Sequence, residues 1–196
     1  MPRSRLMHRT LLLWLVLVTH STTAASPEET TDSCEVPAPI TAPFLLSLNQ
    51  IPRAEPAEDA DGCSWELVRG GTPLVPELIE MTSDATITRH LVPLFGGSYA
   101  VGDIATVALM QIVEIPVLDL VMSLDPDAPT ECGFCAYWDF VRADPEHRLM
   151  LRAELHGWYD EHASQLEWKP NAYRPAGGIW GMPDEPEALA DGIENE

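Results

Sequence analysis

The stretch "YAVGDIATVALMQIVEI" (99–115) decides the fold class of this chain. Its apolar residues recur at every third or fourth position, which gathers them into a broad stripe along one helix. The stripe consists of Val101, Ile104, Ala105, Ala108, Leu109, Ile112 and Val113. Pro116 follows, and because the residue before a proline disfavours helical backbone, we expect the helix to end there. Asp103 lies in the first turn, where the helix dipole favours a carboxylate.

Further helix signals flank this stretch on both sides. Thr72 and Pro73 suit the N-cap and first position of a short helix that ends near Met81. Residues 116–124 predict another short helix, and Asp144 starts a longer one over 144–166. Residues 87–95 are ambiguous and fit a short helix interrupted at a proline. No alternation of period 2 extends over five residues, so we predict a mainly α fold, either a small irregular bundle or a helix-pair array.

Residues 99–116 resemble helix segments of HEAT-like or armadillo-like arrays and segments of uncharacterised exported bacterial proteins, through "Y-x-V-G-D-I-A" and a later "I-P". The resemblance implies a helix rich in small residues that stacks behind a partner helix, and it implies no activity. It covers 18 of the 196 residues. No period of about 40 residues repeats, so we do not expect an extended solenoid.

The first 25 residues have the three parts of a secretory signal. A basic segment, "MPRSRLMHR", precedes the apolar run "TLLLWLVLV", and the small polar residues "THSTTAAS" follow, with Ala24 and Ala25 as cleavage points. The apolar run is shorter than the roughly 20 residues of a membrane-spanning helix. We therefore predict a signal peptide over 1–25, no stable membrane span after its removal, and a soluble product that is secreted or periplasmic.

The charge of the chain restricts its partners. The formal charge is −20, and removal of Arg3, Arg5 and Arg9 leaves 8 basic residues against 31 acidic ones, a charge of −23. Such a surface repels phosphate backbones and anionic lipid headgroups. We therefore expect no nucleic acid as a partner, and instead a basic or neutral protein or a small ligand.

Composition divides the exported chain into three parts. Residues 26–62 form an acidic, proline-rich arm in which the apolar island 44–51 is expected to dock on the core. The helical domain spans 63–168. Residues 169–196 contain prolines, glycines and an excess of acids, and we predict a flexible, disordered acidic tail there.

All four cysteines lie in the exported part, at Cys34, Cys63, Cys132 and Cys135. An even number of cysteines in an oxidising compartment favours disulfides. Pairing 34 with 63 and 132 with 135 is the simplest of three connectivities. A 34–63 bond would close a loop of about 30 residues, worth roughly 3–4 kcal/mol in the chain-entropy model, and would tie the arm to the helical domain.

The pair in "ECGFCAYW" (131–138) also permits a thiol–disulfide oxidoreductase. A helix start after the pair would lower the thiol pKa, but the acidic residues nearby oppose this and no β-strand is predicted before it. A zinc site has only one cysteine pair, and His147 has no second histidine three to five residues later. We predict no cofactor and no metal.

Other candidate sites are weaker. Tyr137, Trp138, Trp158 and Tyr159 could line a ligand groove, although aromatic pairs at helical spacing more often pack in a core. His156 and Asp160 are four residues apart and share a helix face, which suits an acid–base or metal pair but more often gives a surface contact. "DPDAPTE" (125–131) lacks the glycine of a calcium loop, and no nucleophile or phosphate-loop motif occurs. We therefore predict a protein that acts by binding or structural association rather than by catalysis.

Overall fold

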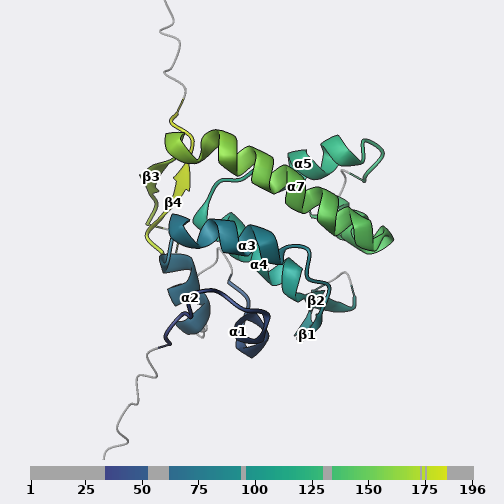
Figure 1. Cartoon of the computed structure of the whole chain (residues 1–196), viewed down its shortest axis with the longest axis horizontal. Coiled ribbons are helices and arrows are strands. Elements are labelled where there is room, and N and C mark those ends of the chain that lie inside the picture. The colour runs from purple at the N-terminus through teal and green to yellow at the C-terminus, as the bar shows by residue number, and fades with distance from the viewer. Residues whose placement is uncertain are drawn as a thin grey trace, which may run out of the picture. The chain divides into compact units, whose positions relative to one another are not determined.

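The computed structural model describes residues 34–52, 62–93, 96–129, 134–172, 174 and 176–184, and these residues belong to one compact unit. The mainly α fold is confirmed, and Figure 1 shows how the helices pack in layers on one another. The helices are α1 (Ala42–Ser47), α2 (Gly62–Arg69), α3 (Val75–Met81), α4 (Val101–Ile112), α5 (Val117–Leu124), α6 (Cys135–Ala143) and α7 (Pro145–His162). Two short 3-10 turns, η1 (Thr72–Leu74) and η2 (Ala163–Gln165), precede α3 and follow α7.

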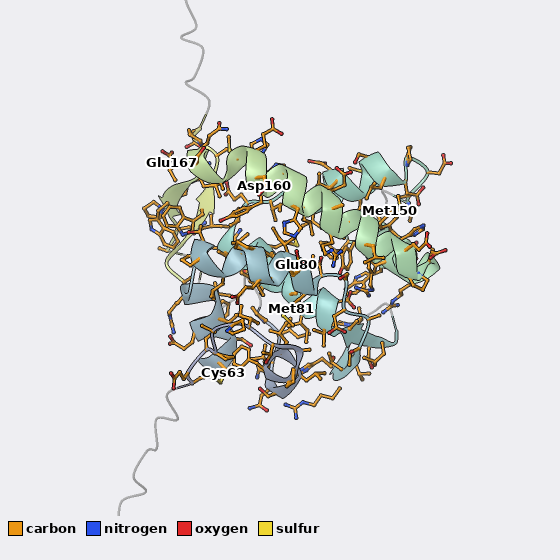
Figure 2. All side chains as sticks on the ribbon, in the orientation of Figure 1. Cys63, Glu80, Met81, Met150, Asp160 and Glu167 are labelled. Carbon is orange, nitrogen blue, oxygen red and sulfur yellow. A yellow bond between two sulfur atoms is a disulfide. The ribbon has the colours of Figure 1, made fainter. Side chains whose placement is uncertain are left out.

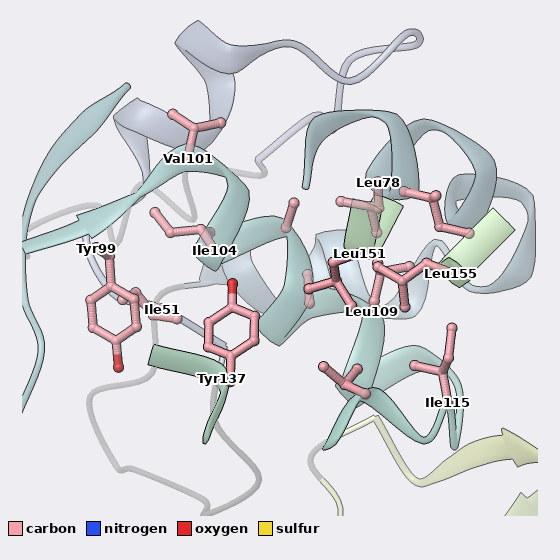
Figure 3. Packing of buried hydrophobic residues seen from close by; sticks show 14 of the residues in the cluster. Ile51, Leu78, Tyr99, Val101, Ile104, Leu109, Ile115, Tyr137, Leu151 and Leu155 are labelled. Carbon is pink, nitrogen blue, oxygen red and sulfur yellow. The ribbon is translucent and has the colours of Figure 1, made fainter. Parts of the chain in front are cut away.

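Helix α4 is the centre of the core. It contacts α1, α2 and α3, while α7 packs on α3, α5 and α6. Every residue of α4 is buried except Val107, Met110 and Gln111, as expected of a helix that is apolar nearly all round. Figure 3 shows Ile104 and Leu109 of this helix among side chains from α3, α6 and α7. The predicted stripe is therefore the surface around which the other helices assemble.

Gly102 allows α4 to start directly against the end of α3. A Cβ atom at this position would overlap the carbonyl oxygen of Thr82. The backbone N–H of Gly102 donates to the carbonyl oxygen of Asp84 at 2.8 Å. The small residue in "VGDIA" thus permits backbone contact that any side chain would prevent.

Four short strands accompany the helices, and the first of them replaces the short helix that residues 87–95 fitted in the sequence. Strands β1 (Ile87–Leu91) and β2 (Ser98–Ala100) pair antiparallel, as do β3 (Glu167–Pro170) and β4 (Gly178–Gly181). Strand β1 was not predicted because its apolar residues are exposed and a polar one is buried: Ile87 and Leu91 lie in solvent, while Thr88 is buried. The second hairpin has strands of only four residues, which is too short for a periodic signal.

Helix α4 is shorter than predicted at both ends. Its predicted first residues, Tyr99 and Ala100, belong to β2. At the other end Val113 is extended and forms a parallel bridge with Trp180, and the N–H of Glu114 donates to the carbonyl oxygen of Trp180 at 2.7 Å. The helix therefore ends at Ile112, three residues earlier than Pro116 predicted, because the residues that would form its last turn pair with β4 instead.

The predicted flexible tail is wrong for the residues that the structure describes between 169 and 184. Ile179 of β4 is buried, and the Lys169 ammonium lies 2.7 Å from a carboxylate oxygen of Asp184 and 3.4 Å from one of Glu114. The hairpin therefore belongs to the folded unit. The rest of the predicted tail, 185–196, lies outside the described residues.

The predicted bond between Cys34 and Cys63 is confirmed, with Cα atoms 5.1 Å apart. It joins the start of the described arm to α2. The apolar island docks as predicted, through one short helix and the buried side chains of Leu45, Leu48 and Ile51. The predicted signal peptide, 1–25, and residues 53–61 of the arm lie outside the described residues. None of the described helices has the length and apolarity that a membrane crossing requires.

Candidate functional site

An open groove of about 260 Å³ lies between α4 and the start of α6. Most of its lining is apolar or aromatic, and its polar side-chain groups are one amide, one phenolic hydroxyl and one indole N–H. The lining residues are Tyr99, Val107, Met110, Gln111, Phe134 and Trp138. A concave surface of this composition is the usual form of a binding site.

The α4 side of the groove follows from helical spacing. Val107, Met110 and Gln111 are three and four residues apart, so they lie on one face of the helix. They are also the half-buried residues of α4, whereas the other positions of this helix are buried by neighbouring elements. The groove thus lies on the one face of the central helix that the described elements leave partly uncovered.

The aromatic side of the groove is held by ring contacts. The Trp138 ring meets Tyr99 edge-on, with centroids 5.2 Å apart, and Phe134 similarly at 6.0 Å. The Arg142 guanidinium lies 5.2 Å from the centroid of the Trp138 ring and donates to the carbonyl oxygen of Gly96 at 3.1 Å. Edge-to-face pairs and a cation over a ring both favour a fixed orientation. The wall is therefore preorganised.

A buried polar cluster lies directly behind this wall. The Asp103 carboxylate is 1% exposed, and its Oδ1 accepts a hydrogen bond of 2.8 Å from the Tyr137 hydroxyl. Arg148 Nη1 lies 2.7 Å from the same oxygen, and Oδ2 accepts the backbone N–H of Ala100 at 2.7 Å. Asp103 occupies the third position of α4, so it also caps that helix. One carboxylate therefore connects α4, α6 and α7.

Burial changes the proton affinities in this cluster. Burial, followed by the Asp103 charge, raises the pKa of Tyr137 well above its ordinary value. For Arg148, burial lowers the pKa, but contacts with Asp103 outweigh it and the net pKa is raised. Nη1 makes no hydrogen bond of good geometry within the described residues, so we regard its contact with Asp103 as an ion pair. The cluster therefore consists of a protonated phenol beside a buried ion pair between Arg148 and Asp103.

The cluster positions the groove through Tyr137. Its ring centroid is 4.7 Å from that of Phe134 and 4.9 Å from that of Trp138, so it contacts both groove aromatics from behind. Figure 3 shows the Tyr137 hydroxyl pointing towards α4, near Ile104. The buried hydrogen bond thus orients the ring on which the groove wall rests.

The structure divides the four predicted aromatic residues. Trp138 lines the groove and Tyr137 lies behind it, but Trp158 stacks on His162 with centroids 4.7 Å apart. The Tyr159 hydroxyl donates to the Thr72 carbonyl oxygen at 3.3 Å, and burial raises the pKa of Tyr159. Of the four, Trp138 alone is in the groove lining.

Sequence reasoning missed the remaining lining residues. The half-buried positions of α4 could have been found as the gap in its apolar stripe, because Val107, Met110 and Gln111 share a face. Tyr99 and Phe134 carried no such signal, since Tyr99 lies in the three-residue strand β2 and Phe134 lies immediately before α6, where periodicity gives no information.

The second cysteine pair is described only in part. Cys135 is the first residue of α6 and is disulfide-bonded. Cys132 lies outside the described residues, so its pairing with Cys135 stays a prediction.

The predicted His156–Asp160 face is used differently. His156 Nε2 lies 2.7 Å from an Oε atom of Glu80, and Arg152 Nη1 lies 3.4 Å from the other. These contacts connect α7 to α3, and Figure 2 shows Glu80 on the side of α3 that faces α7. Asp160 is exposed. Among the described residues, no three histidine, cysteine or acidic side chains are placed together to hold a metal ion.

Comparison of the chain with known protein families, curated proteins and solved structures found no match. The HEAT-like or armadillo-like resemblance of residues 99–116 therefore stays a prediction, and the function rests on the geometry of the chain itself.

Proposed function

We propose that this chain is a binding protein whose groove between α4 and α6 receives an apolar side chain of a basic polypeptide. The observation that carries the proposal is the groove lining, in which Trp138, Phe134 and Met110 surround an open space of about 260 Å³. The lining residues include no carboxylate, histidine, cysteine or lysine, and their one ionisable group is the Tyr99 phenol. Such a lining supports binding rather than catalysis.

The size of the groove supports a side chain as its occupant. Small-molecule sites enclose roughly 300–1,000 Å³ and bury most of their ligand. This groove is smaller and open on one side, so it suits a single projecting side chain from a larger partner. Met110 adds an adaptable edge, because the flexible thioether repacks around different apolar shapes.

The charge of the chain supports a basic partner. Each cation among the described residues already contacts an acceptor, a carboxylate or an aromatic ring on the chain itself: Arg69, Arg89, Arg142, Arg148, Arg152, Lys169 and Arg174. The whole chain has 31 acidic residues against 11 basic ones, so its formal charge is −20 and most of its carboxylates have no cation to pair with. A basic partner is attracted by such a field, and an acidic one is repelled.

Peptide titration tests the proposal. The probes are lysine-flanked peptides with a central tryptophan, with the same peptide carrying a central glycine and an aspartate-flanked analogue as comparisons. We expect the lysine–tryptophan peptide to bind best. Met110→Glu should weaken that binding about tenfold or more, because it brings a charge into the apolar groove; tenfold is about 1.4 kcal/mol. Met150→Glu is the matched control, since Met150 is exposed on α7 and outside the groove lining.

Two results would contradict this function. The first is equal affinity for the tryptophan and glycine peptides, which would mean that the groove takes no side chain. The second is equal weakening by Met110→Glu and Met150→Glu, which would mean that only overall charge matters.

A thiol–disulfide oxidoreductase is the second candidate, because Cys135 opens α6 at the helix end where the dipole lowers a thiol pKa. The test is the reduction potential of the chain after Cys34→Ser and Cys63→Ser substitution. An active oxidant would have a potential near those of known oxidants, about −120 to −180 mV, whereas a structural bond would lie below roughly −300 mV.

We infer that the chain works outside the reducing cytoplasm, in a secreted or periplasmic setting. The bond between Cys34 and Cys63 supports this, because disulfides persist in oxidising compartments. Sequencing the N-terminus of protein recovered from outside the cytoplasm tests it, with cleavage after Ala24 or Ala25 expected. Recovery of the intact chain only from the cytoplasm would contradict it.

A further inference from the structure

A second cavity lies near the C-terminal end of α4, where α2 and the C-terminal hairpin meet that helix. Its volume is about 90 Å³. Val68 of α2 and Ile112 of α4 supply buried apolar atoms, and Trp168 and Trp180 of the hairpin supply two indole rings. Arg69 and Gln111 add polar groups to the lining. The cavity therefore has apolar surfaces, two aromatic walls and a few polar groups.

The hairpin brings the two indoles together by register. Trp168 of β3 pairs directly with Trp180 of β4, so both side chains lie on the same face of the hairpin. Their centroids are 5.7 Å apart at an interplanar angle of 63°. A Cβ atom at Gly178 would overlap the Trp168 indole, so the ring lies against backbone. Trp168 is nonetheless 42% exposed, which leaves part of its surface open to a ligand.

The polar groups of this cavity have hydrogen-bonding capacity to spare. The Nε1–H of Trp180 donates to none of the residues that the structure describes, although an indole N–H in a partly buried position usually finds an acceptor. Gln111 accepts from Arg174 through Oε1 at 3.3 Å, which leaves its amide hydrogens for another acceptor. Arg69 uses Nη1 on Glu66 at 2.5 Å, and a guanidinium has further N–H groups. The cavity thus presents donors towards a ligand rich in oxygen.

Two cations near the cavity are paired with carboxylates, while a third, Arg174, contacts the Met110 carbonyl oxygen and the Gln111 amide oxygen. The Arg69 guanidinium is paired with Glu66, and the Lys169 ammonium is paired with Glu114 and Asp184. An anionic ligand would meet no uncompensated cation in these pairs and would enter a chain with a formal charge of −20. The ligand that fits is neutral, carries acceptor oxygens and has an apolar face that can lie on an indole.

We propose that this cavity and the exposed surface of Trp168 beside it bind a neutral sugar. A cavity of about 90 Å³ cannot enclose a pyranose, so it receives one edge of the ring while the rest of the ring lies on the indole outside it. A pyranose combines an apolar face of C–H groups, which is attracted to the negative face of an indole, with hydroxyls around its edge. The C–H face would lie against Trp168, while the hydroxyls accept from Trp180 Nε1, Gln111 and Arg69. This function is separate from that of the groove between α4 and α6, because the two cavities share only the Gln111 side chain.

Nuclear magnetic resonance of the indole N–H groups tests the proposal on the whole folded chain. The probes are glucose, N-acetylglucosamine and glucuronate, with benzyl alcohol as an aromatic comparison. We expect at least one neutral sugar to shift the Trp180 indole resonance saturably, with a Kd on the order of 1 mM. Trp168→Ala should weaken binding at least tenfold, because it removes the exposed ring.

Trp158→Ala is the matched control, since Trp158 lies on α7 against His162 and outside the cavity lining. It should leave sugar binding unchanged. A folded spectrum with unmoved Trp168 and Trp180 resonances in every sugar would overturn the proposal. Preference for glucuronate or for benzyl alcohol would overturn it as well.

Discussion

At the scale of single residues, Asp103 carries the most structural consequence. Its carboxylate caps α4, accepts from the Tyr137 hydroxyl and pairs with Arg148. We predict that Asp103→Asn destabilises the chain by about 3–5 kcal/mol, because the buried guanidinium loses its counter-charge. Urea denaturation followed by circular dichroism measures this loss.

A double substitution separates the charge from the cap. Asp103→Asn with Arg148→Met removes both charges and keeps an amide oxygen for the Ala100 N–H, so we expect the pair to cost much less than the sum of the single substitutions. Additive costs would show that the ion pair contributes no coupling.

Tyr137 predicts how stability depends on pH. Its pKa in the folded chain is raised above the ordinary 10.0, because the ring is buried beside Asp103. Below about pH 10 the folded and the unfolded chain both keep the phenolic proton, so Tyr137 contributes its full share to stability there. As the pH rises past it, the unfolded chain loses the proton first, so the free energy of unfolding falls by up to about 1.4 kcal/mol per pH unit.

The comparison variant is Tyr137→Phe, unfolded in urea between about pH 9 and pH 11. It should cost about 1–3 kcal/mol near neutrality through the lost hydrogen bond to Asp103, yet lose less stability in alkali than the native chain. Parallel declines in the two chains would show that the Tyr137 proton is not linked to folding.

For single residues, the sequence predicted the place in a helix better than the side chains that each residue contacts. Asp103 was expected in the first turn of a helix and lies there. Its contacts with Tyr137 and Arg148 span more than thirty residues of chain, and periodicity within a helix contains no information about such pairs. Tyr137 was for the same reason assigned to a groove, although its hydroxyl is buried.

At the scale of elements, two glycines in helices give opposite predictions. Gly102 of α4 leaves no space for a Cβ atom beside Thr82, whereas Gly157 of α7 has nothing within 4 Å of that position. We predict that Gly102→Ala destabilises the chain by about 1–3 kcal/mol or more through overpacking. Gly157→Ala should stabilise it by about 1 kcal/mol, because alanine is the better helix former.

Thermal unfolding of both variants measures the difference. Equal effects of the same sign would show that helix propensity, and not the close approach of α3 and α4, governs Gly102.

The helices were predictable because their signals are local. Pro145 after the Asp144 cap marks the start of α7, and the Asp144 side chain accepts the N–H of Glu146 as expected. The strands were not, because β1 places Ile87 and Leu91 in solvent. The β3–β4 hairpin depends on a contact between Val113 and Trp180 that only the folded chain brings together.

At the scale of the whole molecule, the bond between Cys34 and Cys63 contributes most through the unfolded state. The two cysteines are 29 residues apart, and closing such a loop is worth roughly 3–4 kcal/mol. We predict a loss of that size in the Cys34→Ser, Cys63→Ser variant, measured by urea denaturation. A change below about 1 kcal/mol would show that the loop is already restricted in the unfolded chain.

The same bond has a consequence for proteolysis. A protease that cut the chain once anywhere between Cys34 and Cys63 would leave both fragments attached to each other. The nicked protein would migrate as a single band on a gel without reductant and as two bands once reductant is added. Cleavage within this segment would therefore not be detected by any method that measures molecular size under non-reducing conditions.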